Sequence, residues 1–194
     1  MRILVTGCAG FIGFNLCLKL LKSFSKIKVF GIDNFDKYYS PKLKKDRYKI
    51  LAKNKDFYFK KIDLNDSKNL EKFVFKIKPE IIINLAAQAG VRYSLINPRK
   101  YVNTNINGFF NLCEIAKKYN IKKIIYASSS SVYGDSNSFP LKENLFIKPK
   151  NIYGLSKKIN EEMAEAYSAN SQIKFVGLRF FTVYGPWGRP DMMI

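Results

Sequence analysis

The sequence contains no histidine, which excludes Ser-His-Asp catalysis and histidine-bearing zinc sites. Proton transfer near neutral pH must therefore use tyrosine, lysine, a carboxylate or cysteine. Cysteine is scarce too: Cys8, Cys17 and Cys113 lie far apart and show no C-x-x-C spacing. This pattern favours reduced, small apolar residues over a metal or redox site, and no metal is expected.

Long apolar runs are also missing. The longest, at residues 81–83 and 16–21, are far shorter than the roughly 20 residues that span a bilayer. The first residues enter a predicted strand, without the apolar core of a signal peptide. We therefore expect a cytoplasmic protein with no membrane contact. Hydrophobic residues still make up 47% of the 194, enough for the core of an ordinary domain.

Acidic residues are few: 15 stand against 34 lysines and arginines, which gives a formal net charge of +19. Such an excess would suit a nucleic-acid binder. However, only six of the positive residues are arginine, and the lysines are spread along the chain in pairs such as 44–45, 60–61 and 117–118. We expect no specific nucleic-acid function. The positive field would instead help to attract a small anionic substrate.

Short β-branched runs alternate with longer segments of helical period. This alternation predicts an α/β fold, a doubly wound parallel sheet of Rossmann type. Asp66 or Ser67 is expected to cap the third helix and Pro79 to end it. Strands are expected at residues 2–6, 28–32, 57–62, 81–85, 123–127 and 174–179, and helices at 11–24, after Pro41, at 67–78, at 98–119 and at 152–170.

A G-x-x-G-x-x-G loop, formed by Gly7, Gly10 and Gly13, joins the first strand to the first helix. Glycines let the backbone approach a pyrophosphate, and the helix N-terminus offers N–H groups with positive potential. Asp33, about 20 residues further on, would accept hydrogen bonds from the adenosine ribose and repel a 2′-phosphate. These features predict NAD rather than NADP. Asp63, after the third strand, could bond the adenine amine or could equally be a solvated strand end.

A run of serines follows the fifth strand, and the next helix carries Tyr153 and Lys157. Residues at i and i+4 share one helix face, so the ammonium is expected to lower the pKa of the phenol from about 10. This pair would make a general base without histidine. A serine at the carboxyl end of a parallel strand lies where such folds bind ligands. Either motif alone is commonly structural, but their order after a dinucleotide loop predicts catalysis.

These motifs resemble the extended short-chain dehydrogenase/reductase superfamily and its NAD-dependent epimerase/dehydratase family. Residues 86–94, 127–134 and 178–192 are similar to UDP-glucuronate 4-epimerases, and the likeness covers the whole chain. The resemblance implies that Tyr153, Lys157 and Ser129 are catalytic. It implies substrate contacts at Arg92, Ser130, Ser131, Thr182 and Arg189, and NAD contacts at Gly7, Gly10, Phe11, Ile12, Gly13, Asp33, Asp63, Leu64, Leu85, Ala86, Ala87, Thr104, Tyr153, Lys157 and Phe181.

The implied reaction is epimerisation at C4 of UDP-glucuronate to UDP-galacturonate through a 4-keto sugar, with NAD regenerated in each cycle. Arg189 would suit the glucuronate carboxylate. A 4,6-dehydratase would carry Asp-Glu where this chain has Ser130 and Ser131, which argues against that rival. A decarboxylating relative, another nucleotide-sugar epimerase and a non-catalytic NAD-binding fragment stay open as alternatives.

The resemblance also implies a homodimer through helices including 98–119 and 152–170. Residues 1–179 are expected to form the NAD-binding domain and 180–194 to begin a substrate-binding segment. Family members continue well beyond this length, so we expect a missing C-terminal substrate domain and an open edge beside the sixth strand. The chain alone should then be poorly stable and nearly inactive. Five apolar residues would be uncovered: Phe180, Phe181, Val183, Tyr184 and Trp187.

Overall fold

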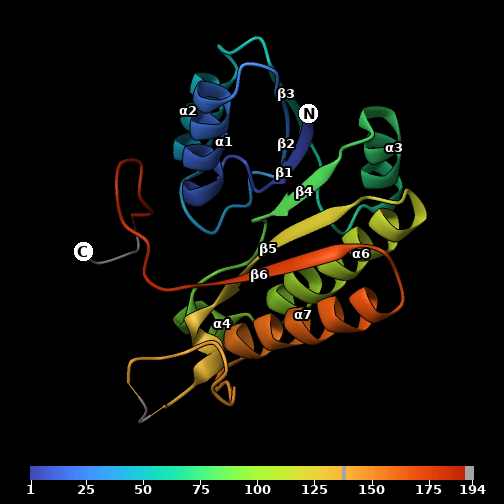
Figure 1. Ribbon diagram of the computed structural model, residues 1–194. Helices are drawn as coiled ribbons and strands as arrows, with labels where there is room; N and C mark the ends of the chain where they lie inside the picture. Colours follow the sequence, from blue (N-terminus) through green and yellow to red (C-terminus); the bar gives the residue numbers. More distant parts are fainter. Residues whose placement is uncertain (137–138, 191–194) are drawn as a thin grey trace.

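The computed structural model describes residues 1–136 and 139–190 (Figure 1). In these residues the chain forms a six-stranded parallel sheet with the strand order β3-β2-β1-β4-β5-β6. This order, with crossover helices between the strands, confirms the doubly wound α/β fold. The strands are β1 (Arg2–Thr6), β2 (Lys28–Asp33), β3 (Phe57–Lys61), β4 (Ile81–Asn84), β5 (Lys123–Ser129) and β6 (Lys174–Phe180).

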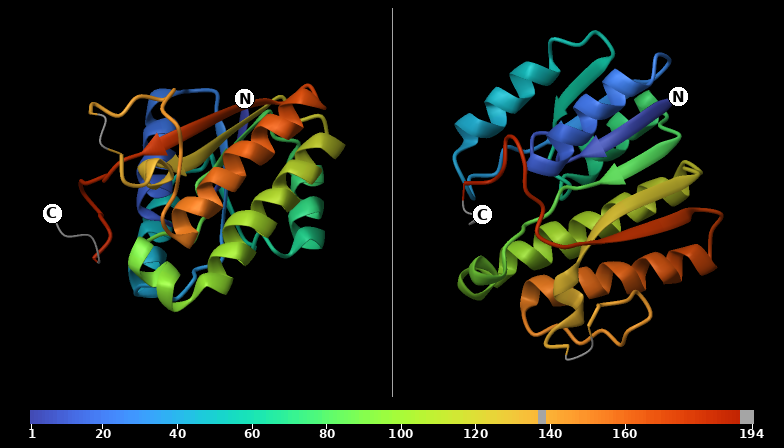
Figure 2. Two further views of the ribbon diagram at one scale, coloured as in Figure 1. Left: turned by 90° about the horizontal axis from the view of Figure 1, so that it is seen from below. Right: turned by 60° about the vertical axis from the view of Figure 1, so that its left-hand side comes forward.

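Helices cover both faces of the sheet. The α-helices are α1 (Phe11–Ser23), α2 (Pro41–Leu51), α3 (Ser67–Ile77), α4 (Val91–Ile96), α5 (Pro98–Tyr101), α6 (Gly108–Lys118) and α7 (Ile152–Ala169). A π-helical segment, η1 (Val102–Asn107), and a 3-10 turn, η2 (Ser130–Tyr133), complete the set for the described residues. Helices α1 and α2 lie on one face, and α3, α6 and α7 lie on the other (Figures 1 and 2).

Alternate residues of β1 belong to two different cores. Ile3 and Val5 pack in a cluster that includes Phe14 of α1. Leu4 packs in the second cluster, which contains Leu112 of α6. Successive side chains of a strand point to opposite faces, so a strand covered on both sides must be apolar at every position. The three cysteines are free and buried, as predicted.

The third helix begins and ends as predicted. The Asp66 side chain accepts a hydrogen bond from the Asn69 N–H at 3.2 Å, which satisfies one of the unpaired groups of the first turn. Lys78 has a left-handed backbone with φ of +45° and ends the helix just before Pro79.

The expected single helix at residues 98–119 is wrong. Helix α5 ends at Tyr101, and the π-helical turns of η1 separate it from α6. In η1 the buried Asn105 accepts a hydrogen bond from the Gln88 N–H at 2.8 Å and donates to Ser156 Oγ at 2.9 Å. A π segment of this kind commonly marks a functional site. Helix α4 was not predicted, because six residues are too few to display a helical period.

Strand β6 lies at one edge of the described sheet, as expected. It pairs with β5 through the register of Ser129 with Phe180, so β5 runs two residues beyond its expected end. The chain then crosses the carboxyl ends of the strands and reaches α1 and α2 (Figures 1 and 2). Phe181, Tyr184 and Trp187 are exposed, whereas Phe180 and Val183 are half-buried.

Residues 191–194 of the expected substrate-binding segment lie outside the described residues. The division of the chain at residue 179 stays a prediction. Among residues 1–136 and 139–190, none of the helices is both long and apolar enough to span a bilayer.

Candidate active site

The turn between β1 and α1 requires glycine. Gly7 has φ of +67°, and a Cβ there would lie 2.7 Å from the Ala86 nitrogen. A Cβ at Gly13 would lie 2.2 Å from the Gly7 carbonyl oxygen. Both clashes are with backbone, which cannot move aside as a flexible side chain could. Gly10 caps α1 without a side chain, so the N–H groups of the first turn, where Phe11 and Ile12 lie, remain suited to a pyrophosphate.

Asp33 lies at the end of β2 beside this loop and is buried. Its carboxylate accepts hydrogen bonds from the N–H groups of Ala9 (3.1 Å) and Phe35 (2.8 Å). Burial raises the pKa of this carboxyl, and these two bonds and the positive charges of Lys44 and Arg47 limit the rise. A carboxylate oxygen has two lone pairs, so each oxygen can also accept a ribose hydroxyl. These acceptor oxygens therefore fit the ribose hydroxyls at the adenosine end of NAD.

Asp63 is not a freely solvated strand end. Its carboxylate accepts hydrogen bonds from Asn34 Nδ2 at 2.7 Å and from the Asn65 N–H at 2.9 Å. Burial alone would raise its pKa, but the bonds from Asn65 and Asn34 outweigh burial and hold the pKa below its usual range. Asp63 thus ties the loop after β2 to the loop after β3. Its contact with adenine stays a prediction.

The chain leaves β4 through a contact that the sequence did not reveal. Thr6 Oγ1 donates to Asn84 Oδ1 at 2.6 Å and accepts from the Ala86 N–H at 3.0 Å. These bonds position the three residues after β4 that were expected to contact NAD: Leu85, Ala86 and Ala87.

The remaining expected NAD contacts are more scattered. Leu64 is buried against Gly108 at the start of α6. Thr104 is half-buried in η1, and Phe181 is 58% exposed just beyond β6. Their contacts with NAD stay predictions.

The three residues expected to be catalytic converge where β5 meets α7. Ser129 is the last residue of β5, and Tyr153 and Lys157 lie in the first two turns of α7. The Asn151 side chain caps that helix by accepting from the Gly154 N–H at 2.8 Å. A hydrogen bond joins Tyr153 to Ser129.

Lys157 is held in a different way. It is buried, and its ammonium donates to the Ala127 carbonyl oxygen at 2.7 Å. Burial lowers the pKa of Lys157 to about 8. A cation that gives up its proton this readily suits a proton-transfer site near neutral pH.

The expectation that Lys157 lowers the pKa of Tyr153 is wrong for this structure. Burial raises the pKa of the phenol, and the opposing influences are the hydrogen bond with Ser129 and the charge of Arg189. The Lys157 ammonium is bonded to Ala127 instead. Desolvation therefore outweighs the proximity that the i, i+4 spacing suggested.

The sequence did not predict an ion pair that links β6 to α7. Arg179 of β6 meets Glu161 of α7 in a bidentate pair, with Nε to Oε1 at 2.9 Å and Nη2 to Oε2 at 2.8 Å. Ser128 also donates to Glu161, and Arg179 Nη1 donates to the Tyr133 hydroxyl at 3.1 Å. The network joins β5, β6, η2 and α7 around Ser129. One signal was available, because Glu161 lies four residues after Lys157 on the same helix face.

The expected substrate residues are placed unevenly. Ser130 and Ser131 are half-buried in η2, where the Ser131 N–H donates to Ser129 Oγ at 3.2 Å. The Arg189 guanidinium lies over the Tyr38 ring, 5.3 Å from its centroid. Arg92 on α4 and Thr182 after β6 are both exposed, and their substrate contacts stay predictions.

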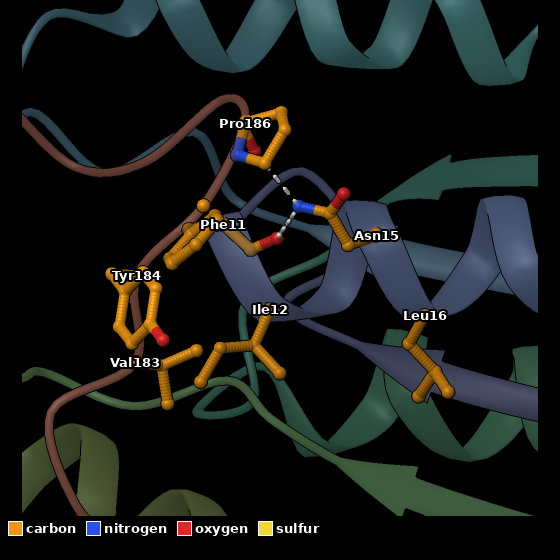
Figure 3. A pocket seen from close by; sticks show the side chains of 8 residues that line it. Phe11, Ile12, Asn15, Leu16, Val183, Tyr184 and Pro186 are labelled. Carbon is orange, nitrogen blue, oxygen red and sulfur yellow. Dashed lines mark hydrogen bonds between the residues drawn. The ribbon is translucent and has the colours of Figure 1, made fainter.

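A hollow of about 260 Å³ lies between α1 and the segment that follows β6 (Figure 3). Asn15 bridges the two, because its Nδ2 donates to the carbonyl oxygens of Phe11 (3.0 Å) and Pro186 (3.3 Å). The hollow adjoins the glycine loop rather than Ser129 at the end of β5. Its lining residues are Phe11, Ile12, Asn15, Leu16, Val183, Tyr184, Gly185 and Pro186.

Residues 3–194 match the model of the NAD dependent epimerase/dehydratase family, and the chain belongs to this family. The family inferred from the motifs is thus confirmed, and its description names the cofactor predicted from the glycine loop and Asp33.

Three particular relatives are similar over nearly the whole chain. Protein CapI of Staphylococcus aureus is 49% identical over 100% of this chain and 58% of its own length. UDP-glucuronate 4-epimerase 6 of Arabidopsis thaliana is 46% identical over 99% of this chain and 42% of its own. The crystal structure of UDP-glucuronic acid 4-epimerase from Bacillus cereus with UDP-glucuronic acid and NAD superposes with a TM-score of 0.92 at 40% identity, covering 99% and 60% of the two chains. The chain therefore spans about half the length of these relatives.

Proposed function

We propose that this chain is the NAD-binding and catalytic part of a nucleotide-sugar 4-epimerase that converts UDP-glucuronate to UDP-galacturonate. The observation that carries the proposal is the convergence of Ser129, Tyr153 and Lys157 at the carboxyl end of β5. The similarity to proteins named UDP-glucuronate 4-epimerase favours this substrate over other nucleotide sugars. In this proposal residues 1–179 form the NAD-binding domain, and 180–194 begin the substrate-binding segment.

The side chains divide the chemistry between them. Tyr153 accepts the proton of the C4 hydroxyl and returns it after the keto sugar has rotated to present its other face. Ser129 is hydrogen-bonded to the same phenol. Lys157, held by the Ala127 carbonyl, would hold the ribose beside the nicotinamide of bound NAD. The glycine loop and Asp33 would hold NAD, which would supply the hydride acceptor for C4 and the donor for its return to the opposite face. Arg189 orients the glucuronate carboxylate.

Alternative reactions make different demands on this site. A dehydratase needs an acid and a base beyond the catalytic serine, and the hydroxyls of Ser130 and Ser131 can serve as neither. A decarboxylating relative would use the same base and the same arginine, so it differs only in its product. A non-catalytic NAD-binding fragment would bind the cofactor and turn over nothing.

The test is a chain completed with the C-terminal part of a homologous epimerase and supplied with NAD and UDP-glucuronate. NMR should show UDP-galacturonate forming until the two sugars reach equilibrium. Release of carbon dioxide with a pentose product would replace the proposal with decarboxylation. NAD binding without any product would leave the non-catalytic alternative. Residues 1–194 alone serve as the comparison and are expected to turn over little.

We further propose a homodimer and a cytoplasmic location. Phe110 on α6 and Leu155 on α7 are 47% and 42% exposed, and such apolar surface suits a subunit contact. Free, buried cysteines suit a reducing compartment. Sedimentation of the completed chain at several concentrations tests the dimer, because a monomer at every concentration would contradict it.

A further inference from the structure

Arg47 is the largest fully buried side chain among the described residues, yet it belongs to none of the sequence motifs. It lies on α2, and its guanidinium makes four hydrogen bonds. Nη1 donates to the Ala9 carbonyl oxygen at 3.1 Å and to the Tyr39 hydroxyl at 2.7 Å. Nη2 donates to the carbonyl oxygens of Trp187 at 2.6 Å and Gly188 at 3.2 Å. One side chain thus joins the glycine loop to a segment that lies 140 residues beyond Arg47 itself.

Every one of these four acceptors is neutral. A buried cation without a directly bonded carboxylate loses much of its hydration energy, and Nε has no hydrogen-bond partner among the described residues. A lysine could supply the charge but not two donors to successive carbonyls, because only a guanidinium has that planar fork. The geometry therefore points to Arg47 as a device that fixes the position of backbone, at some cost in stability.

The backbone that it fixes is itself strained. Trp187 has φ of +64°, a left-handed conformation that is unfavourable for a residue with a Cβ. Such a conformation persists only where the surroundings enforce it. Here the rings of Trp187 and Phe14 pack edge to face, with 5.6 Å between their centroids. The backbone carbonyl of Trp187 accepts a hydrogen bond from Arg47. The next residue but one is Arg189, whose guanidinium lies over Tyr38.

We propose that Arg47 is a positioning residue that docks residues 187–189 onto the glycine loop and thereby places Arg189 for the substrate. The docking follows from the hydrogen bonds alone, whereas its effect on substrate rests on the proposed function. Because Arg47 also binds the Ala9 carbonyl, any ligand that orders the glycine loop should strengthen the docking, and docking should strengthen that ligand's binding by the same factor.

The chain carries its own reporter, because Trp187 is its single tryptophan. Trp187 fluorescence and its quenching by acrylamide should be compared among wild type, Arg47→Met, Arg47→Lys and Arg99→Met. Arg99 is exposed on α5 and is the matched control. Docked Trp187 is already 41% exposed, and its contact with Phe14 is what undocking would remove. Hydrogen bonds to a charged donor are strong, so their loss in Arg47→Met should shift the docking equilibrium at least about tenfold toward a Trp187 that emits further to the red and is quenched more readily than in wild type. The Trp187 emission and quenching of Arg47→Lys should lie between those of wild type and Arg47→Met, and those of Arg99→Met should match wild type.

A milder variant tests the docking even if Arg47→Met unfolds the chain. Tyr39→Phe removes one acceptor of Arg47 and leaves the guanidinium in place. It should raise quenching of Trp187 in the same direction as Arg47→Met, though less, with unchanged circular dichroism. If Arg47→Lys and Tyr39→Phe both fold and both leave Trp187 as in wild type, the proposal is overturned.

The completed enzyme supplies the functional half of the test. Arg47→Lys should raise the KM for UDP-glucuronate about tenfold and lower kcat much less, since misplacing Arg189 removes binding shared by substrate and transition state. A proportionate fall in kcat with unchanged KM would overturn the role assigned to Arg47. Absence of turnover in the completed wild type would contradict the proposed function instead, and Trp187 fluorescence would still decide the docking.

Discussion

The glycine loop after β1 and the proposed catalytic site at the end of β5 are held in place by different kinds of contact. The loop is shaped by backbone, because Gly7 and Gly13 leave no room for a Cβ and Asp33 binds two N–H groups. The end of β5 is shaped by side chains from distant parts of the chain, including the ion pair of Arg179 with Glu161. A phosphate site needs only N–H groups at a turn, whereas a proton-transfer site needs side chains held at chosen distances.

The largest effect should follow from removing the proposed base at the end of β5. In the completed chain, Tyr153→Phe should lose at least about 10²-fold in turnover, because the variant lacks the hydroxyl proposed as the proton acceptor. NAD binding, measured by calorimetry, should be nearly unchanged. Tyr119→Phe, which removes a hydroxyl bonded to Glu71 far from β5, is the control. Near-normal turnover of Tyr153→Phe would place the base elsewhere.

The next largest effect is the pH dependence of stability that the buried Lys157 should cause. Its pKa is about 8 in the folded chain and 10.5 ordinarily, so the unfolded chain binds the proton more tightly. The free energy of unfolding of wild type, minus that of Lys157→Met, should therefore be lowest below pH 8. This difference should rise between about pH 8 and 10.5, by up to about 3 kcal/mol. Urea unfolding across this range measures it, with Lys19→Met, an exposed lysine, as the control. A difference that stays flat with pH would contradict the buried ammonium.

A smaller effect should follow at the ion pair. Glu161→Gln should destabilise the chain by about 1–2 kcal/mol, less than for a fully buried pair because both side chains retain some exposure. Glu162→Gln, the next residue, breaks only an exposed contact with Lys158 and should cost under about 0.5 kcal/mol. Chemical denaturation compares the two. Equal costs would show that the pair does not hold α7 in place.

The smallest effect should be at the glycine loop. Wild type should bind NAD at least about tenfold more tightly than NADP, because the Asp33 carboxylate accepts from a ribose diol and repels a phosphate. Asp33→Asn should narrow this ratio, since the amide keeps one acceptor and loses the charge. Calorimetric titration with both cofactors measures the ratio. Equal or tighter NADP binding by wild type would contradict the assignment.

The same contrast explains what the sequence could predict. The alternation of strand and helix patterns predicts the fold. Gly7, Gly13 and Asp33 lie close together in the chain, and their spacing predicts the NAD loop. The positions of Tyr153 and Lys157 were also predictable from one helix turn. Asn105, Arg47 and Arg179 were not, because their partners lie 51, 140 and 18 residues away. The burial that raises the pKa of Tyr153 was equally hidden, since desolvation depends on the packed structure.

The two hydrogen bonds that Asp33 accepts from Ala9 and Phe35 have a consequence for the energetics of ligand capture. They fix the rotamer of the carboxylate during folding, before any ligand arrives. Immobilising a side chain during association typically costs about 0.5–1.5 kcal/mol, and here that ordering is already complete. The carboxylate that we propose to bind the adenosine ribose is thus preorganised. Adenosine fragments that reach no other part of the site should therefore bind with little entropic penalty from the protein.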